Sequence, residues 1–244
     1  MLKRNNRYYS FFDFTNNFES PFFFICDHSS NYIPRKFKYL GLNSKKFSSH
    51  IAWDIGARDF TLQLTKKFKA FCFLSNFSRL LVDPNRKTNQ YDLIVQDVDN
   101  TRIPGNENLS EIDYSKRLKY YNSYHKGLST HLKECTHKNK KLMVISIHSF
   151  NKFILKKNRH TEIGLLWNKN LDLTIPLLKF FLKMKIDVGN NFPYSGFHYN
   201  YTLDKHATFN KLTNISIEIR NDLIDHKKGI DKWVKILKLA LENI

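Results

Sequence analysis

Short, continuous apolar runs alternate along this chain with segments whose apolar residues recur every three or four positions. An apolar run bounded by turn residues predicts a strand buried on both faces, and the longer spacing predicts an amphipathic helix. The runs span 21–26, 71–74, 142–150, 162–167 and 215–222, and the helical segments span 51–68, 111–133, 171–184 and 226–244. This order predicts an α/β fold in which helices sandwich a mixed, mostly parallel sheet.

The chain is expected to form one domain over residues 1–244, because no internal repeat or low-complexity linker divides it. Residues 1–20 are polar and aromatic with no clear period, and we expect an irregular lead-in there. With 244 residues, 41% of them hydrophobic, the chain is long enough to bury a sizeable core.

The formal net charge of +18 suggests an anionic partner. The lysines are scattered, however, and the chain shows no focused basic face and no nucleic-acid-binding motif. We therefore expect non-specific affinity for polyanions and no specific nucleic-acid partner. No apolar stretch is long enough to span a bilayer, no signal-peptide cleavage site follows the basic start, and the three cysteines show no paired spacing. A cytoplasmic protein with free thiols is expected.

Residues 78–86, with the sequence Ser-Arg-Leu-Leu-Val-Asp-Pro-Asn-Arg, combine an apolar run with two arginines. The run is expected to form a buried strand that ends at Pro84, because proline lacks the N–H that a sheet needs. Arg79 and Arg86 carry permanent charge and forked donors, which suit the binding of a carboxylate. The alternative is that both arginines are solvated loop charges.

Two histidines stand at the ends of predicted buried strands. His28 follows the run 21–26, and His148 closes the run 142–150, so both could meet at one edge of a parallel sheet. Two histidines with one carboxylate and an open water position form a common catalytic zinc set. Glu218 lies among isoleucines in the last predicted strand, where a carboxylate must be paired, face a site or point to solvent. At the start of a predicted helix, Asp54 could simply act as a cap.

The chain resembles the N-formylglutamate amidohydrolase family over about residues 20–226. Matching pieces occur in the order of the family: 26–29, His50 with 53–57, 78–86, 103–106, 147–149, 191–194, 203–206 and 218–224. The resemblance implies a three-layer α/β/α sandwich of the zinc-exopeptidase type. It also implies a zinc-dependent hydrolase of linear amides beside a carboxylate, with a small-molecule N-acyl amino acid as substrate and N-formyl-L-glutamate as the reference.

The resemblance also implies roles for individual residues. One zinc ion per chain would be held by His28, His148 and a carboxylate, for which we choose Asp54, although a carboxypeptidase-like pattern would place the third ligand at Asn31. The remaining roles concern catalysis and substrate binding: Glu218 as general base, Arg79 at the oxyanion, Asn85 and Arg86 at the substrate carboxylate, and His206 and Arg220 in the pocket.

Two other functions fit the same residues. The same fold and metal could act on a different amide, such as a cell-wall peptide or another N-acyl amino acid, because a fold does not determine a substrate. A non-catalytic, basic polyanion-binding protein could also keep this scaffold. A binding module would have no need to keep His28, His148, Arg79, Arg86 and Glu218 together, which favours an enzyme.

Overall fold

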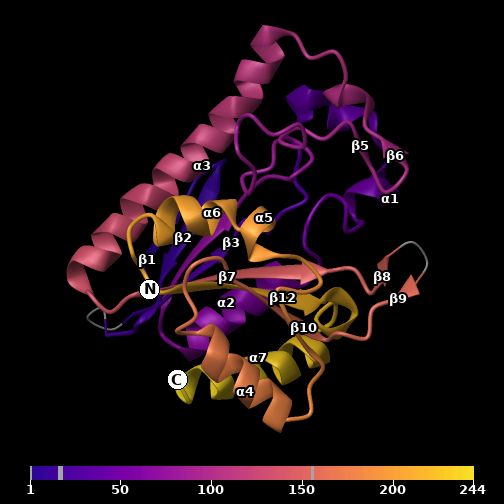
Figure 1. The fold of residues 1–244 in the computed structure, drawn as a ribbon. Helices are drawn as coiled ribbons and strands as arrows, with labels where there is room; N and C mark the ends of the chain where they lie inside the picture. Colours follow the sequence, from indigo (N-terminus) through magenta and orange to yellow (C-terminus); the bar gives the residue numbers. More distant parts are fainter. Residues whose placement is uncertain (1, 16–18, 155–156) are drawn as a thin grey trace.

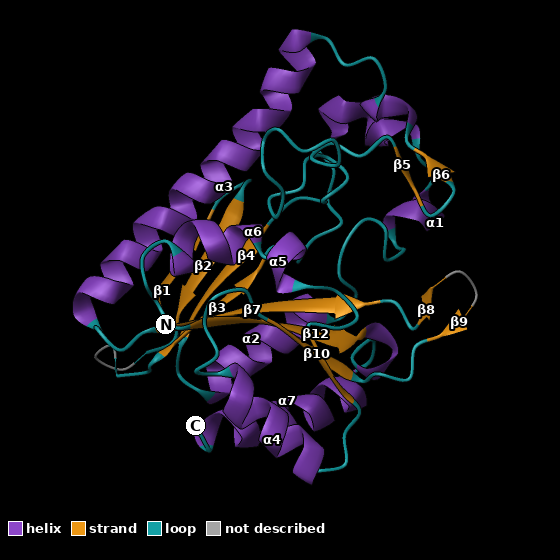
Figure 2. Ribbon diagram, in the orientation of Figure 1, coloured by secondary structure: helices purple, strands orange, loops and turns teal. Residues whose placement is uncertain are grey.

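One eight-stranded sheet forms the centre of the protein (Figures 1 and 2). A computed structural model describes residues 2–15, 19–154 and 157–244. The strands in sheet order are β1 Leu2–Asn5, β2 Tyr9–Asp13, β4 Phe71–Ser75, β3 Phe22–Cys26, β7 Met143–Phe150, β12 Asn214–Arg220, β10 Ile163–Leu166 and β11 Val188–Asn190. The four central strands β4, β3, β7 and β12 run parallel. On one side β2 pairs antiparallel with β4 and with β1, and on the other side β10 pairs antiparallel with β12 and parallel with β11.

Helices cover both faces of this sheet, which confirms the predicted three-layer sandwich (Figure 1). The long helix α3 lies on one face, and α2, α4 and α7 lie on the other. The principal helices are α2 Ala57–Lys67, α3 Glu111–Lys138, α4 Thr174–Lys183 and α7 Lys227–Glu242. Shorter helical pieces are η1 Arg35–Gly41, α1 Ser44–Phe47, η2 Pro104–Asn106, α5 Gly196–Tyr199, α6 Tyr201–Leu203, η3 Asp204–Thr208 and η4 Asn221–Leu223. Two small hairpins pair β5 Asp97–Val98 with β6 Thr101–Arg102, and β8 Phe153–Ile154 with β9 Lys157–Asn158.

The alternation of side chains along β7 and β12 decides which residues can reach a site. Ile145 and Ile147 of β7, like Ile217 of β12, belong to the core beneath α2 and α7. His148 and Glu218 therefore point to the opposite face, the one that α3 covers. Polar side chains near the carboxyl ends of these two strands are thus directed to one side of the sheet.

The amino-terminal segment differs from the expected irregular lead-in. Residues 2–5 and 9–13 form β1 and β2, and β2 pairs antiparallel with β4 along Tyr9–Asp13. Phe11 packs into the α3-side core and Phe12 into the core on the other side. The sequence of this segment shows no alternation of apolar and polar residues, because aromatic side chains lie on both faces of β2. Such a pattern is typical of a strand that is covered on both sides.

The stretch 78–86 was wrongly predicted to contain a strand. Leu80, Leu81 and Val82 are completely buried, but their backbone forms turns, with the Leu81 N–H donating to the oxygen of Ser78. Burial within the α3-side core accounts for the apolar run, and burial alone does not specify a backbone conformation.

Helix α2 begins at Ala57, later than expected from the pattern. Gly56 precedes it with a φ of 79°, in the left-handed region that glycine adopts most easily. A β-carbon at Gly56 would meet the backbone oxygen of Ile224 at 2.0 Å. The turn that carries Asp54 therefore lies just outside the helix.

Among the described residues, no helix has both the length and the apolar character needed to cross a bilayer. Cys26, Cys72 and Cys135 are buried and form no disulfide, as expected.

Candidate metal centre and active site

His28, Asp54 and His148 come together at the carboxyl end of the central strands. His28 lies two residues beyond β3, and His148 lies near the end of β7. Asp54 comes from the turn before α2, and its N–H donates to the backbone oxygen of His28 at 3.0 Å. Each residue offers one ligand atom, and the three atoms lie within 4.8 Å of one another. The sheet thus places two imidazoles and one carboxylate at a common point.

The donor atoms of this group suit a zinc ion. The Nδ1 atom of His148 lies 2.8 Å from Oδ2 of Asp54, and Nδ1 of His28 lies 3.4 Å from the same oxygen. Nδ1 of His28 is buried and makes no hydrogen bond to a described residue. A buried nitrogen left without a partner is costly unless something else binds it. Two imidazole nitrogens and one carboxylate oxygen are ligands that zinc accepts.

The other nitrogen of each histidine is held by a hydrogen-bonding partner. Nε2 of His28 lies 2.8 Å from Oδ1 of Asp83, and Nε2 of His148 lies 3.0 Å from Oγ of Ser146. Nε2 of His148 also lies 3.5 Å from Oδ2 of Asp27. Carboxylates behind metal-binding histidines fix the ring orientation and leave the opposite nitrogen for the metal. Both rings are therefore oriented with Nδ1 toward Asp54.

The charges at this centre favour a divalent cation. Burial alone would raise the pKa of Asp54, but His28 and His148 outweigh it and hold that pKa well below its usual range. Burial is likewise outweighed at Asp83 by Arg79 and His28, and at Asp27 by His148, so both pKa values are lowered. Against the effect of burial, the same carboxylates raise the pKa of His28 and of His148, so the protons on the two imidazoles balance the acid groups, and a divalent cation bound between the three side chains would take the place of those protons.

Glu218 stands beside this group on the next strand. In the parallel register of β7 and β12, Glu218 lies opposite His148. Its side chain is buried, and Oε2 makes no hydrogen bond within the described part of the chain. Burial raises the pKa of Glu218 to about 7, an effect that His148 partly offsets and Asp54 reinforces. A carboxyl group that titrates near neutral pH can both accept and donate a proton.

Arg79 lies near Oδ1 of Asp54, whereas the two histidines lie near Oδ2. Its Nη2 donates to Asp83 at 2.7 Å, and its Nη1 lies 3.8 Å from Oδ1 of Asp54. The side chain remains 27% exposed, so the guanidinium is held by the carboxylates while part of it faces open space.

Asn85 and Arg86 make mainly internal contacts in this structure. The amide of Asn85 donates to the oxygen of Tyr199, and its carbonyl accepts from the N–H of Thr202. Nε of Arg86 donates to Asp92 at 2.6 Å, and the guanidinium lies 5.1 Å from the ring centre of Tyr199. The Nη2 group of Arg86 makes no hydrogen bond to a described residue.

The hydrogen bonds and ion pairs that His206 and Arg220 make with described residues do not include His28, Asp54 or His148. Nε2 of His206 lies 2.8 Å from Nδ1 of His125, whose Nε2 lies 3.0 Å from the oxygen of Pro84. The guanidinium of Arg220 binds Asp222 and the backbone oxygens of residues 159 and 160. Both residues support loops around the site.

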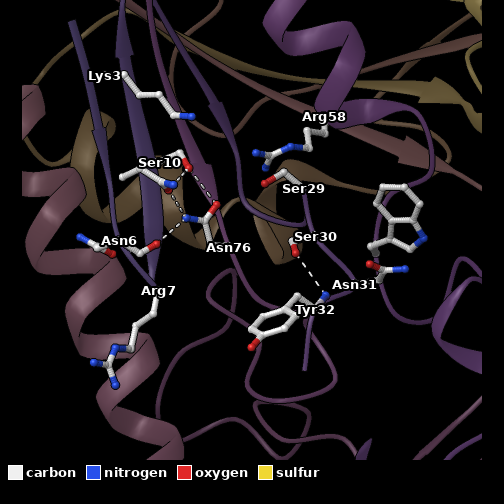
Figure 3. A pocket seen from close by; sticks show the side chains of 12 residues that line it. Lys3, Asn6, Arg7, Ser10, Ser29, Ser30, Asn31, Tyr32, Arg58 and Asn76 are labelled. Atoms are coloured by element: carbon white, nitrogen blue, oxygen red, sulfur yellow. Dashed lines mark hydrogen bonds between the residues drawn. The ribbon is translucent and has the colours of Figure 1, made fainter. Parts of the chain in front are cut away.

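Asn31 lies apart from the histidines. Its amide donates to the oxygen of Phe47 at 3.0 Å. The residue lines a different pocket of about 390 Å³, whose wall also includes Lys3 and Arg58 (Figure 3). None of His28, Asp54 and His148 lines that pocket.

Several residues of the site were not singled out from the sequence. Asp27, Asp83 and Tyr124 form the outer partners, with the Tyr124 hydroxyl donating to Asp27 at 2.6 Å. Asp27 and Asp83 lie within the family-like pieces 26–29 and 78–86, and that position was the available signal. Tyr124 lies on α3 at ordinary helical spacing, which carries no functional signal.

Comparison with known proteins agrees with this geometry. The model of the N-formylglutamate amidohydrolase family matches residues 20–225. The crystal structure of gene product Atu2144 from Agrobacterium tumefaciens is 30% identical, with a TM-score of 0.90, and the match covers 97% of this chain and 96% of that one.

An N-formylglutamate amidohydrolase from Ralstonia eutropha JMP134 is 14% identical, with a TM-score of 0.76 and 96% of each chain covered, which supports the fold. No curated protein matches the chain. The family model spans most of the sequence, and an arrangement of charged residues suited to hydrolysis lies within the span it matches. The chain therefore belongs to the N-formylglutamate amidohydrolase family and is a hydrolase of carbon–nitrogen amide bonds other than peptide bonds.

Proposed function

We propose that this protein is a zinc-dependent amidohydrolase that cleaves the linear amide of an N-acyl amino acid. The reference substrate is N-formyl-L-glutamate, which would give formate and glutamate. The observation that carries the proposal is the buried group of His28, Asp54 and His148 with Glu218 beside it in the sheet. The family match supports the choice of an amide as the bond that is cleaved.

His28 and His148 would hold the zinc ion through Nδ1, and Asp54 would hold it through a carboxylate oxygen. When bound, zinc lowers the pKa of a water ligand to about 7 and polarises a carbonyl group. Asp83 and Asp27 would keep the two rings in the orientation that zinc requires.

Glu218 would act as the general base. It takes a proton from the attacking water and passes it to the leaving nitrogen, a role that suits its pKa of about 7. Arg79 would stabilise the negative charge that develops on the carbonyl oxygen, since its guanidinium is fixed by Asp83 before the substrate arrives.

Arg86, supported by Asn85, would bind the substrate carboxylate beside the scissile amide. Its free Nη2 provides a donor, and Asn85 anchors the segment 199–202 that forms the neighbouring wall. His206 and Arg220 would act as positioning residues: His206 through His125 and the Pro84 loop, and Arg220 through the backbone at residues 159 and 160.

Metal removal tests the proposed function directly. Protein dialysed against a chelator is expected to lose hydrolysis of N-formyl-L-glutamate and to regain it when one equivalent of zinc is added. A panel of N-acyl amino acids and a cell-wall peptide, assayed with zinc, would rank the substrates. If the cell-wall peptide is cleaved faster than N-formyl-L-glutamate, the proposed substrate is wrong and the peptide is preferred. Salt-dependent retention on nucleic acid without bound metal or hydrolysis would instead favour a polyanion-binding protein.

Replacing Arg86 with alanine is expected to raise KM for N-formyl-L-glutamate by about 10- to 100-fold, because a charged hydrogen bond to the substrate is lost. KM for the analogue whose α-carboxylate is an amide should change little. Arg102→Ala is the matched control, since Arg102 is exposed and pairs with Glu107. Equal rises in KM for both substrates would argue against a carboxylate contact at Arg86.

A further inference from the structure

Arg159 is a buried arginine without a carboxylate partner. The residue is 8% exposed, and its Nη1 donates hydrogen bonds to the backbone oxygen of Asn151 and to the Tyr194 hydroxyl, both at 3.2 Å. Its Nε and Nη2 groups make no hydrogen bond to a residue in the described ranges, and no acidic side chain there forms an ion pair with it. All acidic residues of the chain lie in those ranges.

Other arginines around the site differ from Arg159. Arg79, Arg86 and Arg220 pair with Asp83, Asp92 and Asp222, respectively. Arg117 is buried more completely and also forms no ion pair with a described carboxylate, but its two Nη groups donate to the oxygens of Leu81, Asn106 and Gly105. Arg159 is thus held in place through Nη1, and its Nε and Nη2 groups remain available as hydrogen-bond donors. A buried cation of this kind is costly unless an anion arrives to neutralise it.

Arg159 lies near the residues that are proposed to carry out the reaction. Its guanidinium stacks on Phe150 and Tyr194, 5.6 Å and 5.2 Å from the ring centres. Phe150 follows His148 by two residues on β7, so both side chains share one face, about 7 Å apart along the strand. Burial and the negative charge of Glu218 raise the pKa of Tyr194, and Arg159 and Arg79 partly offset this rise. The Tyr194 hydroxyl is therefore close enough to the proposed catalytic residues to be affected by their charges.

A wall of aromatic residues joins Arg86 and Arg159, the two arginines that could bind carboxylates of the substrate. Tyr194 lies 5.6 Å from Tyr199, measured between ring centres, and Tyr199 lies beneath the guanidinium of Arg86. Arg86 and Arg159 therefore stand at opposite ends of a two-tyrosine wall, and Arg159 has the more open fork. An arginine fork matches the two oxygens of a carboxylate.

We propose that Arg159, held in place by Tyr194 and Phe150, binds the side-chain carboxylate of the substrate and selects N-acyl derivatives of dicarboxylic amino acids. This inference rests on the proposed function. Arg86 binds the carboxylate beside the scissile amide, and Arg159 binds the side-chain carboxylate, which lies farther from that amide. This assignment agrees with the contact of Arg159 with Phe150, two residues after His148 on β7. The same protein without Arg159 would still cleave N-acyl amino acids but would distinguish glutamate from glutamine poorly.

The test compares N-formyl-L-glutamate with N-formyl-L-glutamine, which differ only in the side-chain carboxylate. Arg159→Met is expected to lower kcat/KM for the glutamate substrate by about 10- to 100-fold, mainly through KM, and to leave the glutamine substrate within about threefold. Arg159→Lys should lose less, because it keeps the charge without the fork. Lys152→Met is the matched control: Lys152 is a neighbouring surface cation that pairs with Asp222. Equal losses on both substrates, or an unchanged preference for glutamate, would overturn the proposal.

A binding measurement separates this inference from the proposed function. Calorimetric titration with glutarate and with its monoamide needs no turnover. The unaltered protein should bind glutarate more tightly, and Arg159→Met should bind the two ligands with similar affinity. If the unaltered protein does not hydrolyse N-formyl-L-glutamate but still binds glutarate more tightly than its monoamide, the proposed function is wrong and the carboxylate site at Arg159 is supported. Hydrolysis of N-formyl-L-glutamate by a protein that binds glutarate and its monoamide equally would reject the carboxylate site alone.

Discussion

Replacing Glu218 with glutamine is expected to lower kcat for N-formyl-L-glutamate by about 10²- to 10⁴-fold, the range usually supplied by a positioned acid–base group. The substitution keeps the shape of the side chain in β12 and removes its ability to accept a proton. KM should change little, because the lost interaction acts in the transition state. Steady-state kinetics with zinc-loaded protein would measure both constants.

The matched control for Glu218→Gln is Glu111→Gln, at an exposed position in the first turn of α3. Both proteins should bind the same amount of zinc, because Glu218 lies outside the ligand group. Unaltered kcat in Glu218→Gln protein with full zinc content would assign proton transfer to another residue.

Replacing His148 with alanine is expected to abolish stoichiometric zinc binding and reduce hydrolysis to the level of metal-free protein. The change removes one of three ligands and leaves the carboxylates of Asp27 and Asp54 without their shared partner. Zinc affinity should fall by more than the roughly 10- to 100-fold typical when a hydrogen-bonding partner of a ligand is lost. Asp83→Asn leaves the three ligands in place and alters a partner that His28 shares with Arg79, so it should show that smaller loss of zinc affinity.

Zinc content per chain and the rise in Tm on zinc addition provide two readouts for these variants. A ligand that binds the native state raises Tm, so the unaltered protein should gain stability and His148→Ala protein should not. Asp54→Asn keeps the volume of the side chain, so a loss of zinc in this variant is less easily explained by a folding defect than a loss in His148→Ala protein. His137→Ala, at an exposed position of α3, is the control. Full zinc content in both His148→Ala and Asp54→Asn proteins would refute the ligand assignment.

Much of this arrangement could be predicted from the order of apolar runs. The runs before His28 and around His148 indicated parallel central strands, and parallel strands bring their carboxyl ends to one edge. That reasoning placed both histidines together although they lie in distant parts of the sequence. The choice of Asp54 required the family resemblance, because an aspartate before a helix is most simply explained as a cap.

Other features depend on contacts that no local pattern encodes. Tyr124 meets Asp27 across 97 positions, and Arg159 meets Tyr194 across 35. The stretch 78–86 shows a related problem: its apolar residues signal burial, which a strand and a packed loop provide equally well. The contacts of Asn85 with the segment 199–202 likewise became visible only when both segments were placed in space.

The position of β12 in the sheet has a consequence for the order of folding. This strand comes late in the chain, yet it lies between β7 and β10 and joins the two parts of the sheet. The two histidines can meet once β7 pairs with β3, whereas Glu218 arrives only when β12 is inserted. Because β12 is synthesised after β3 and β7, we expect the proposed metal ligands to be available before the proposed general base during synthesis.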